Sequence, residues 1–184
     1  MNRTIISVSL IVLLMTSCEV GNDPFLITAD QVGKLSKETR VSQLGEIYKQ
    51  DSIVNRRFDS TYIFGGNEIE IYETSGNQLL RLDPKTPGDT ASRIGDIRIL
   101  DPAFKTEKGL STRSTYKEIL ENYTIKKIEN TITDAVIFLE EIPAYITIDK
   151  KHLPTIFQLS TTHKIESSLI PDNAPIDQFW IGWE

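Results

Sequence analysis

The sequence predicts an α+β fold in which two tandem units, each a short helix packed on antiparallel β-strands, form one continuous, mainly β domain. Three observations lead to this prediction. Two stretches resemble each other at a constant spacing, each carries apolar residues on one helix face, and each precedes segments of alternating apolar and polar residues. We therefore expect one domain over residues 27–184, with unit one at about 27–100, unit two at about 101–150 and C-terminal strands in 151–184.

The internal repeat is clearest where residues 35–48 align with residues 110–123, position by position and without a gap. Four positions of the first stretch recur as identical residues in the second: Leu35, Ser36, Glu46 and Tyr48. A second correspondence, at a shorter spacing, joins Ile71 to Ile137, Leu80 to Ile146, Leu82 to Ile148 and Asp83 to Asp149. The shorter spacing means that unit one carries extra residues, and we expect them within Asp59–Gly66.

Each unit is predicted to begin with a short helix that needs a sheet to pack on. In unit two, four residues share one helix face: Tyr116, Ile119, Leu120 and Tyr123. Thr115 and Glu118 have the spacing of a capping box, which satisfies free backbone amides at the helix start. In unit one, the shared face consists of Val41, Leu44 and Tyr48, with Thr39 as the expected N-cap and with Gly45, which weakens the helix by about 1 kcal/mol relative to alanine.

The strands are predicted from alternation of apolar and polar residues. In unit one, Glu68–Tyr72 and residues 80–82 form a hairpin around the turn Thr74–Asn77, and a further strand at 97–99 ends at Asp101-Pro102. In unit two, residues 135–140 and 144–149 form a hairpin around Ile142-Pro143. The C-terminal part adds predicted strands at 156–159, 164–170 and 179–183.

The hairpin of unit two is apolar on both faces, which requires an explanation. Ile137, Ile146 and Ile148 are expected to face the helices, so Val136, Phe138 and Tyr145 occupy the opposite face. One explanation is that the C-terminal segment covers this second face. The other is an exposed apolar patch for a partner, made of Val136, Phe138 and Tyr145 together with Trp180 and Trp183.

The N-terminus has the pattern of a bacterial lipoprotein signal. Arg3 precedes an apolar run from Ile5 to Met15, too short to span a bilayer, and the lipobox Leu13–Cys18 follows. We expect residues 1–17 to be cleaved, Cys18 to carry the lipid that anchors the protein to the membrane, and residues 18–26 to act as a tether. Position 19 is a glutamate and not the aspartate that signals retention in the inner membrane, so we expect a lipid-anchored protein of the outer membrane. The sequence leaves two alternatives for the side it faces, the periplasm or the cell surface.

Charge and cysteine content restrict the partners. Cleavage before Cys18 removes Arg3, which leaves 19 of the 20 basic residues against 26 acidic residues and a net charge of −7. This balance argues against binding of nucleic acid. Because Cys18 is the only cysteine, the domain cannot form a disulfide and depends on an ordinary apolar core.

No catalytic or metal-binding motif stands out, and we predict no catalytic residue, no metal and no cofactor. His152 and His163 lack the neighbouring ligands of a zinc site. In Ser160–His163 hydroxyls and an imidazole are close in sequence, but adjacent residues of a strand point to opposite faces, so this proximity does not indicate a catalytic pair. The loop Asp172–Asp177 carries oxygen side chains without the spacing of a calcium loop, and it is predicted to be a polar turn.

The stretch Gly109–Tyr123 and the order of the units resemble known envelope proteins. Single units of a helix followed by antiparallel strands occur in the small lipoprotein of the outer-membrane β-barrel assembly machinery, and tandem units occur in the secreted β-lactamase inhibitor protein. The chain also looks like envelope lipoproteins of Bacteroidetes-type bacteria. The resemblance covers roughly residues 27–150, and it implies binding or scaffolding rather than turnover.

Three functions therefore stand as expectations. The first is a noncatalytic cell-envelope lipoprotein that binds or scaffolds a protein or an envelope component such as a glycan. The second is a glycan or peptidoglycan hydrolase with an unrecognised pair of carboxylates in a cleft between the units. The third is a spacer within a larger envelope complex.

Overall fold

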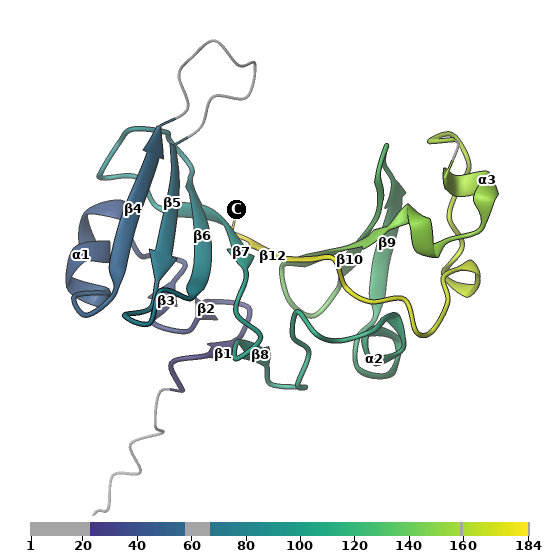
Figure 1. Ribbon diagram of the computed structural model, residues 1–184, viewed down its shortest axis with the longest axis horizontal. Coiled ribbons are helices and arrows are strands. Elements are labelled where there is room, and N and C mark those ends of the chain that lie inside the picture. The colour runs from purple at the N-terminus through teal and green to yellow at the C-terminus, as the bar shows by residue number, and fades with distance from the viewer. Residues whose placement is uncertain (1–22, 58–66, 159, 184) are drawn as a thin grey trace, which may run out of the picture.

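An eight-stranded antiparallel sheet runs through the whole computed structural model, which describes residues 23–57, 67–158 and 160–183 (Figure 1). The strands lie in the order β4-β5-β6-β7-β12-β11-β10-β9. Their bounds are, in that order, Ser52–Arg57, Asn67–Tyr72, Gln78–Pro84, Ile94–Ile99, Gln178–Gly182, Ala144–Asp149, Asp134–Leu139 and Ile125–Asn130. The fold is mostly β, with a few short helices.

The last strand in sequence, β12, lies in the middle of the sheet and joins its two halves. It pairs antiparallel with β7 on one side and with β11 on the other. Figure 1 shows β4 to β7 on one side of the molecule and β9 and β10 on the other, with β12 crossing between them. Strands that are far apart in the sequence therefore become direct neighbours, as when Phe179 pairs with Ile99.

A second, four-stranded sheet has the order β3-β2-β1-β8 and lies beside the first half. Its strands are all two residues long: β1 Leu26–Ile27, β2 Gln31–Val32, β3 Leu35–Ser36 and β8 Lys105–Thr106. β1 and β8 are parallel, and Phe25 packs edge-on against Phe104 with ring centroids 5.1 Å apart. This contact fastens the start of the domain to the segment that links its two halves.

The helices are short and pack on one face of the large sheet. Their bounds are η1 Val41–Gln43, α1 Leu44–Ile47, α2 Tyr116–Asn122, η2 Lys150–His152, α3 Thr155–Gln158 and η3 Ser167–Leu169, where η marks a 3-10 helix. In the part of the chain that the structure describes, no helix has both the length and the apolar character needed to cross a bilayer.

The core lies between the sheet and these helices because alternate strand residues point to one face. The core positions of the central strands are at most 2% exposed: Ile69, Ile71, Leu80, Leu82, Ile97, Ile99, Ile137, Ile146, Phe179 and Ile181. Tyr116 and Ile119 of α2 are fully buried against them, as Leu44 of α1 is on the other half. The alternation that predicted the two hairpins is confirmed at Ile69, Ile71, Leu80 and Leu82 in the first and at Ile137 and Ile146 in the second.

Two predictions about the helices were wrong in detail. Leu120 is 43% exposed, so the buried face of α2 consists of Tyr116, Ile119 and the following Tyr123. In unit one the N-cap of η1 is Arg40 rather than Thr39. The hydroxyl of Thr39 instead accepts a hydrogen bond from the backbone N–H of Ser36 at 3.0 Å, which closes the turn before the helix. The capping box of Thr115 and Glu118 is confirmed.

Two of the three predicted C-terminal strands were also wrong. Residues 155–158 form α3, because Pro154 starts a helical turn and its carbonyl accepts a hydrogen bond from the N–H of Phe157. Residues 164–170 contain the 3-10 turn η3, which the hydroxyl of Tyr116 fastens to α2 through Ser167 at 2.6 Å. The region Asp59–Gly66, the predicted cleavage site and Cys18 lie outside the described residues.

The same backbone arrangement occurs before both α1 and α2. Thr39 bonds back to Ser36, and Ser114 bonds back to Ser111. Two residues further along, the N–H of Val41 donates to the carbonyl of Ser92, just before β7. In the same way, the N–H of Tyr116 donates to the carbonyl of Ala174, just before β12. Each helix is thereby hydrogen-bonded to the segment that leads into the fourth strand of its half of the sheet.

Candidate binding face

The face of the large sheet that points away from the helices carries one continuous row of side chains. The register of seven strand pairs places one residue from each strand in this row, which we call the central row: Val54, Glu70, Arg81, Arg98, Trp180, Tyr145, Phe138 and Lys127. Neighbours in a row of an antiparallel sheet have Cβ atoms about 4.5–5.5 Å apart, so their side chains interact directly.

One half of the central row is a stack of three aromatic rings with a cation at each end. The rings of Tyr145 and Trp180 are parallel within 8° at 5.7 Å, and Phe138 follows at 5.9 Å with a tilt of 31°. The guanidinium of Arg98 lies 5.7 Å from the Trp180 ring, and the Lys127 ammonium lies 4.1 Å from the Phe138 ring. The faces of the rings are therefore turned toward their neighbours in the row.

The other half of the central row is an ion-pair network around Glu70. This carboxylate is only 3% exposed and accepts hydrogen bonds from Arg56 at 2.6 Å and from the Tyr72 hydroxyl at 3.0 Å. Arg81 lies 3.7 Å from Glu70 and 3.4 Å from Glu68. Burial raises the pKa of Glu70, but the hydrogen bonds from Arg56 and Tyr72 outweigh burial and hold that pKa below its ordinary value.

A pair of acidic residues lies beside the central row, where Asp83 of β6 faces Asp96 of β7. Burial, together with the negative charges of Glu68 and Asp96, raises the pKa of Asp83 to about 6. Asp96 accepts a hydrogen bond from the Tyr145 hydroxyl at 3.0 Å, which links the acidic pair to the aromatic stack. The charge state of Asp83 therefore changes closer to neutral pH than that of an ordinary aspartate.

Replacing Asp83 with asparagine should raise the free energy of unfolding by about 1–2 kcal/mol at neutral pH and change it little near pH 4. Between the ordinary pKa of 3.8 and the folded value of about 6, the folded state keeps the proton that the unfolded state releases. The stability of the unmodified protein therefore falls as pH rises through this window, and partial exposure limits the size of the fall. Urea unfolding at both pH values measures the difference, and an equal change at both would contradict the prediction.

A side chain at position 182 would crowd the hydrogen bond between Tyr145 and Asp96, and Gly182 avoids this. A Cβ atom at this position would lie 3.1 Å from the carboxylate Oδ1 of Asp96 and 3.3 Å from the ring of Tyr145. Burial and the neighbouring Asp96 carboxylate raise the pKa of Tyr145 well above its ordinary value. The phenol therefore stays protonated and donates to Asp96.

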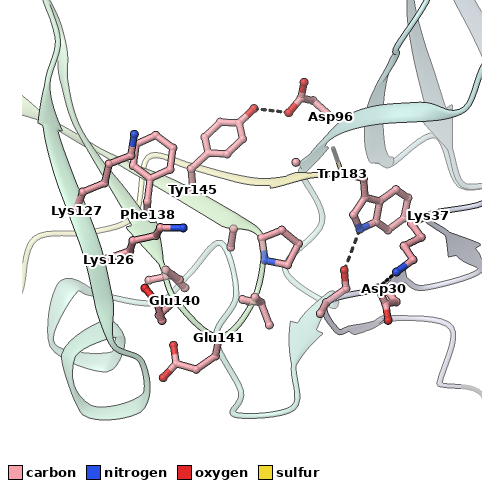
Figure 2. Close-up of a pocket in the computed structure, with 16 residues that line it drawn as sticks. Asp30, Lys37, Asp96, Lys126, Lys127, Phe138, Glu140, Glu141, Tyr145 and Trp183 are labelled. Carbon is pink, nitrogen blue, oxygen red and sulfur yellow. Dashed lines mark hydrogen bonds and ion pairs between the residues drawn. The ribbon is translucent and has the colours of Figure 1, made fainter.

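A pocket of about 770 Å³ opens at the edge of this face, next to Tyr145 and Phe138 (Figure 2). The β10–β11 turn, residues 140–143, forms one wall, and Asp30, Lys37 and Trp183 form the opposite wall. Lys37 and Asp30 form an ion pair at 2.7 Å, whereas Glu141 accepts hydrogen bonds from the N–H of Thr124. The pocket extends the open face from the aromatic stack toward the strand ends.

Three of the five residues predicted to form an apolar patch lie together in the central row: Phe138, Tyr145 and Trp180. Val136 is half-buried in the same strand as Phe138 and on the same face. Trp183 lies outside the central row, one residue beyond the end of β12, and only 5% of it is exposed. Its indole N–H donates to the carbonyl of Ala29 at 3.1 Å, which holds the ring in the pocket wall opposite the β10–β11 turn.

The C-terminal segment packs beside α2 and the β9–β10 turn. The backbone carbonyls of Asp172 and Ala174 accept hydrogen bonds from the first residues of α2, and Asn130 donates to the carbonyls of Ser160 and His163. The loop Asp172–Asp177 therefore docks a helix through its backbone. Within the described ranges, no cluster of three or more histidine, cysteine or acidic residues is placed to bind a metal ion.

Ser160 and His163 lie between α3 and η3, in a segment without regular secondary structure. Their Oγ and Nδ1 atoms are 3.0 Å apart, and the imidazole is exposed. Among the residues that the structure describes, no carboxylate hydrogen-bonds to this imidazole. The pair therefore lacks the third group that orients a catalytic histidine.

Sequence reasoning did not predict that Arg98, Arg81 and Glu70 belong to the same surface as the aromatic residues. Each was visible only as the polar residue of an alternating strand. The register that aligns them depends on pairing between β7 and β12, which are far apart in the sequence. The unusual signal was the aromatic composition of residues 179–183, which marks β12 but does not reveal its neighbours.

The fold and this face define an antiparallel β-sheet protein with helices on one side and an open, mixed aromatic and charged surface on the other. No protein-family model matches the chain, and no curated protein matches it. Among solved structures, the chain is similar to the uncharacterized protein YfeY from Escherichia coli, with a TM-score of 0.52 and 12% sequence identity. The match covers 85% of this chain and 98% of that protein, and at this identity it demonstrates a shared fold alone.

Proposed function

We propose that this protein is a noncatalytic lipoprotein of the bacterial outer membrane, anchored by acyl chains on Cys18, and that the open face of its large sheet binds a protein partner. The observation that carries the proposal is the central row, in which stacked aromatic side chains and arginines cross the sheet on the face without helices. The anchor is inferred from residues 1–18 alone.

The composition of the central row supports binding to a protein. Tryptophan, tyrosine and arginine are the residue types that contribute most to protein–protein interfaces, and they are most effective when clustered near the centre of a packed surface. Trp180, Tyr145 and Arg98 form such a cluster at the centre of the sheet. Their half-buried positions also mean that little side-chain freedom remains to be lost on binding.

We further propose that the chain consists of two tandem units that meet at β7 and β12. The hydrogen-bond arrangement that recurs before α1 and α2 supports this division, because each helix is fastened to the segment before the fourth strand of its own half. Arg98 and Trp180 would then lie at the junction of the units. A partner bound there would contact both units at once.

The orientation of the aromatic rings argues for a protein rather than a glycan partner. Sugars bind aromatic residues by stacking on the ring face, but the faces of Tyr145 and Trp180 are occupied by each other and by Phe138 and Arg98. Ring edges and polar groups remain available to a partner. Such edges suit apolar and anionic side chains of another protein.

Site-specific photocrosslinking in native envelopes tests the binding proposal. The photoreactive amino acid p-benzoylphenylalanine at position 145 should yield a discrete, protease-sensitive adduct. The same amino acid at position 120, an exposed site of α2 on the opposite side of the sheet, should not yield this adduct. Replacing Trp180 with alanine should reduce the yield at position 145 several-fold, because one third of the aromatic stack is lost. Equal products from both positions, or no product from position 145, would contradict protein binding at this face.

One observation favours the hydrolase alternative. Asp83, whose pKa is raised to about 6, pairs directly with Asp96 on the adjacent strand. A raised pKa is the property that a general acid requires. Incubation with purified peptidoglycan, followed by assay of released reducing ends, distinguishes the two functions. Binding without catalysis gives no release, whereas release that disappears in both Asp83→Asn and Asp96→Asn would establish the hydrolase.

A further inference from the structure

The centre of the open face holds a guanidinium group without an acidic partner. Arg56 and Arg81, the other two arginines of this face whose contacts are defined, each lie within 4.0 Å of a glutamate oxygen. Throughout residues 23–57, 67–158 and 160–183, no carboxylate comes within that distance of Arg98. The guanidinium carbon of Arg98 instead lies 5.7 Å from the centroid of the Trp180 ring.

Because Arg98 is half-buried, leaving its guanidinium group without an anion costs free energy. The side chain is half-buried, and its strand neighbours in the central row are Arg81 and Trp180, a like charge and an apolar ring. Burial and the charge of Arg81 lower the pKa of Arg98, and the more distant charges of Asp177 and Glu68 offset this lowering only in part. A partly desolvated cation beside a second cation gains strongly when an anion is placed next to it.

We propose that the protein partner presents an aspartate or glutamate side chain to Arg98, so that the open face recognises a segment of another protein that carries one carboxylate among apolar residues. The inference rests on the proposed function and specifies the chemistry of its partner. The flat guanidinium offers two parallel N–H groups to one carboxylate. Apolar side chains beside that carboxylate would then pack on the edges of Trp180 and Tyr145.

The charges around Arg98 favour a single carboxylate over an anionic membrane surface. Arg81 is already neutralised by Glu68 and Glu70, and Asp83 and Asp96 add negative charge beside the row. The whole chain also has a net charge of −6. A sheet of lipid phosphates would be repelled by these groups, whereas one side chain can reach Arg98 between them.

The crosslink at position 145 can report on this contact in the full-length, lipid-anchored protein. Replacing Arg98 with glutamine should reduce the yield of the adduct roughly tenfold or more, because the partner's carboxylate would be left buried and unpaired. Lysine at position 98 should restore part of the yield, since it keeps the charge but not the planar fork. The matched control is Arg113→Gln, an exposed arginine in the turn before α2, which should leave the yield unchanged.

Mass spectrometry of the adduct completes the test. The crosslinked peptide should contain an aspartate or glutamate next to apolar residues, and millimolar N-acetylglutamate should compete with it more strongly than N-acetylglutamine. An undiminished yield in Arg98→Gln, or an adduct with the mass of a phospholipid, would overturn this inference. Loss of fold in Arg98→Gln would appear as a lowered melting temperature. In that case the competition by N-acetylglutamate, measured with Arg98 intact, decides whether the partner's carboxylate binds here. Absence of any adduct at position 145 when Arg98 is intact would instead refute the proposed function.

Discussion

Replacing Phe179 with alanine should lower the free energy of unfolding by about 3–5 kcal/mol, a large share of the stability of a domain of this size. Phe179 is fully buried in β12 and pairs with Ile99 of β7 and Ile146 of β11. Its ring therefore fills the core where the two halves of the sheet meet. Removing the ring leaves a cavity bordered by both halves.

Urea unfolding followed by circular dichroism measures this loss, and hydrogen exchange locates it. Amide protons of β7, β11 and β12 should lose protection together, because β12 is hydrogen-bonded to both neighbours. Phe179→Leu should cost about 1 kcal/mol, since most of the volume is retained. Ile132→Ala is the neutral control, because Ile132 is 83% exposed in the β9–β10 turn. A loss below about 1 kcal/mol in Phe179→Ala, well under the usual cost of emptying a core site, would show that β12 does not hold the two halves together.

Replacing Cys18 with alanine should abolish lipid attachment and leave the leader, residues 1–17, uncleaved. Each buried methylene of an acyl chain contributes about 0.8 kcal/mol, so two or three chains make an anchor that does not dissociate on a biological timescale. Cys18 is the only cysteine of the chain, so a second site for thioether-linked lipid does not exist in the sequence.

Labelling with radioactive palmitate and fractionation of cells that produce each variant test the anchor. The unmodified protein should carry the label, sediment with membranes and lack residues 1–17, whereas Cys18→Ala should carry no label. The leader of Cys18→Ala should also remain attached, because the lipoprotein signal peptidase acts only after lipidation. Label on the alanine variant, or an unmodified thiol in the native protein, would refute the anchor.

Local patterns predicted the two hairpins, the capping box and the last strand. Ile69 and Ile71 alternate with glutamates, and Gly76 adopts a positive φ of 93° in the turn that follows them, so sequence and backbone agree at each position. The same kind of pattern predicts the hairpin of residues 134–149. In both hairpins, interactions between residues close in sequence were sufficient to specify the strands and the turn.

Predictions were wrong at two C-terminal segments and at one position of α2. Residues 155–158 have strand-like composition but follow Pro154, and their buried Phe157 packs in a helical turn. Residues 164–170 find no strand to pair with and instead bond to α2 through Ser167. Leu120 fits the helical period, but at this point α2 turns it to solvent at 43% exposure.

The sequence by itself determined the alternation of the strands and the capping of the second helix, and it carries the pattern on which the proposed lipid anchor rests, because each depends on residues within a few positions of one another. Only the tertiary structure decided that β12 inserts between β7 and β11, which places Arg98 against Trp180 and aligns the central row. Pairing between distant strands depends on register, which local residue preferences do not specify. The candidate binding face exists only because that register brings together side chains from eight separate strands.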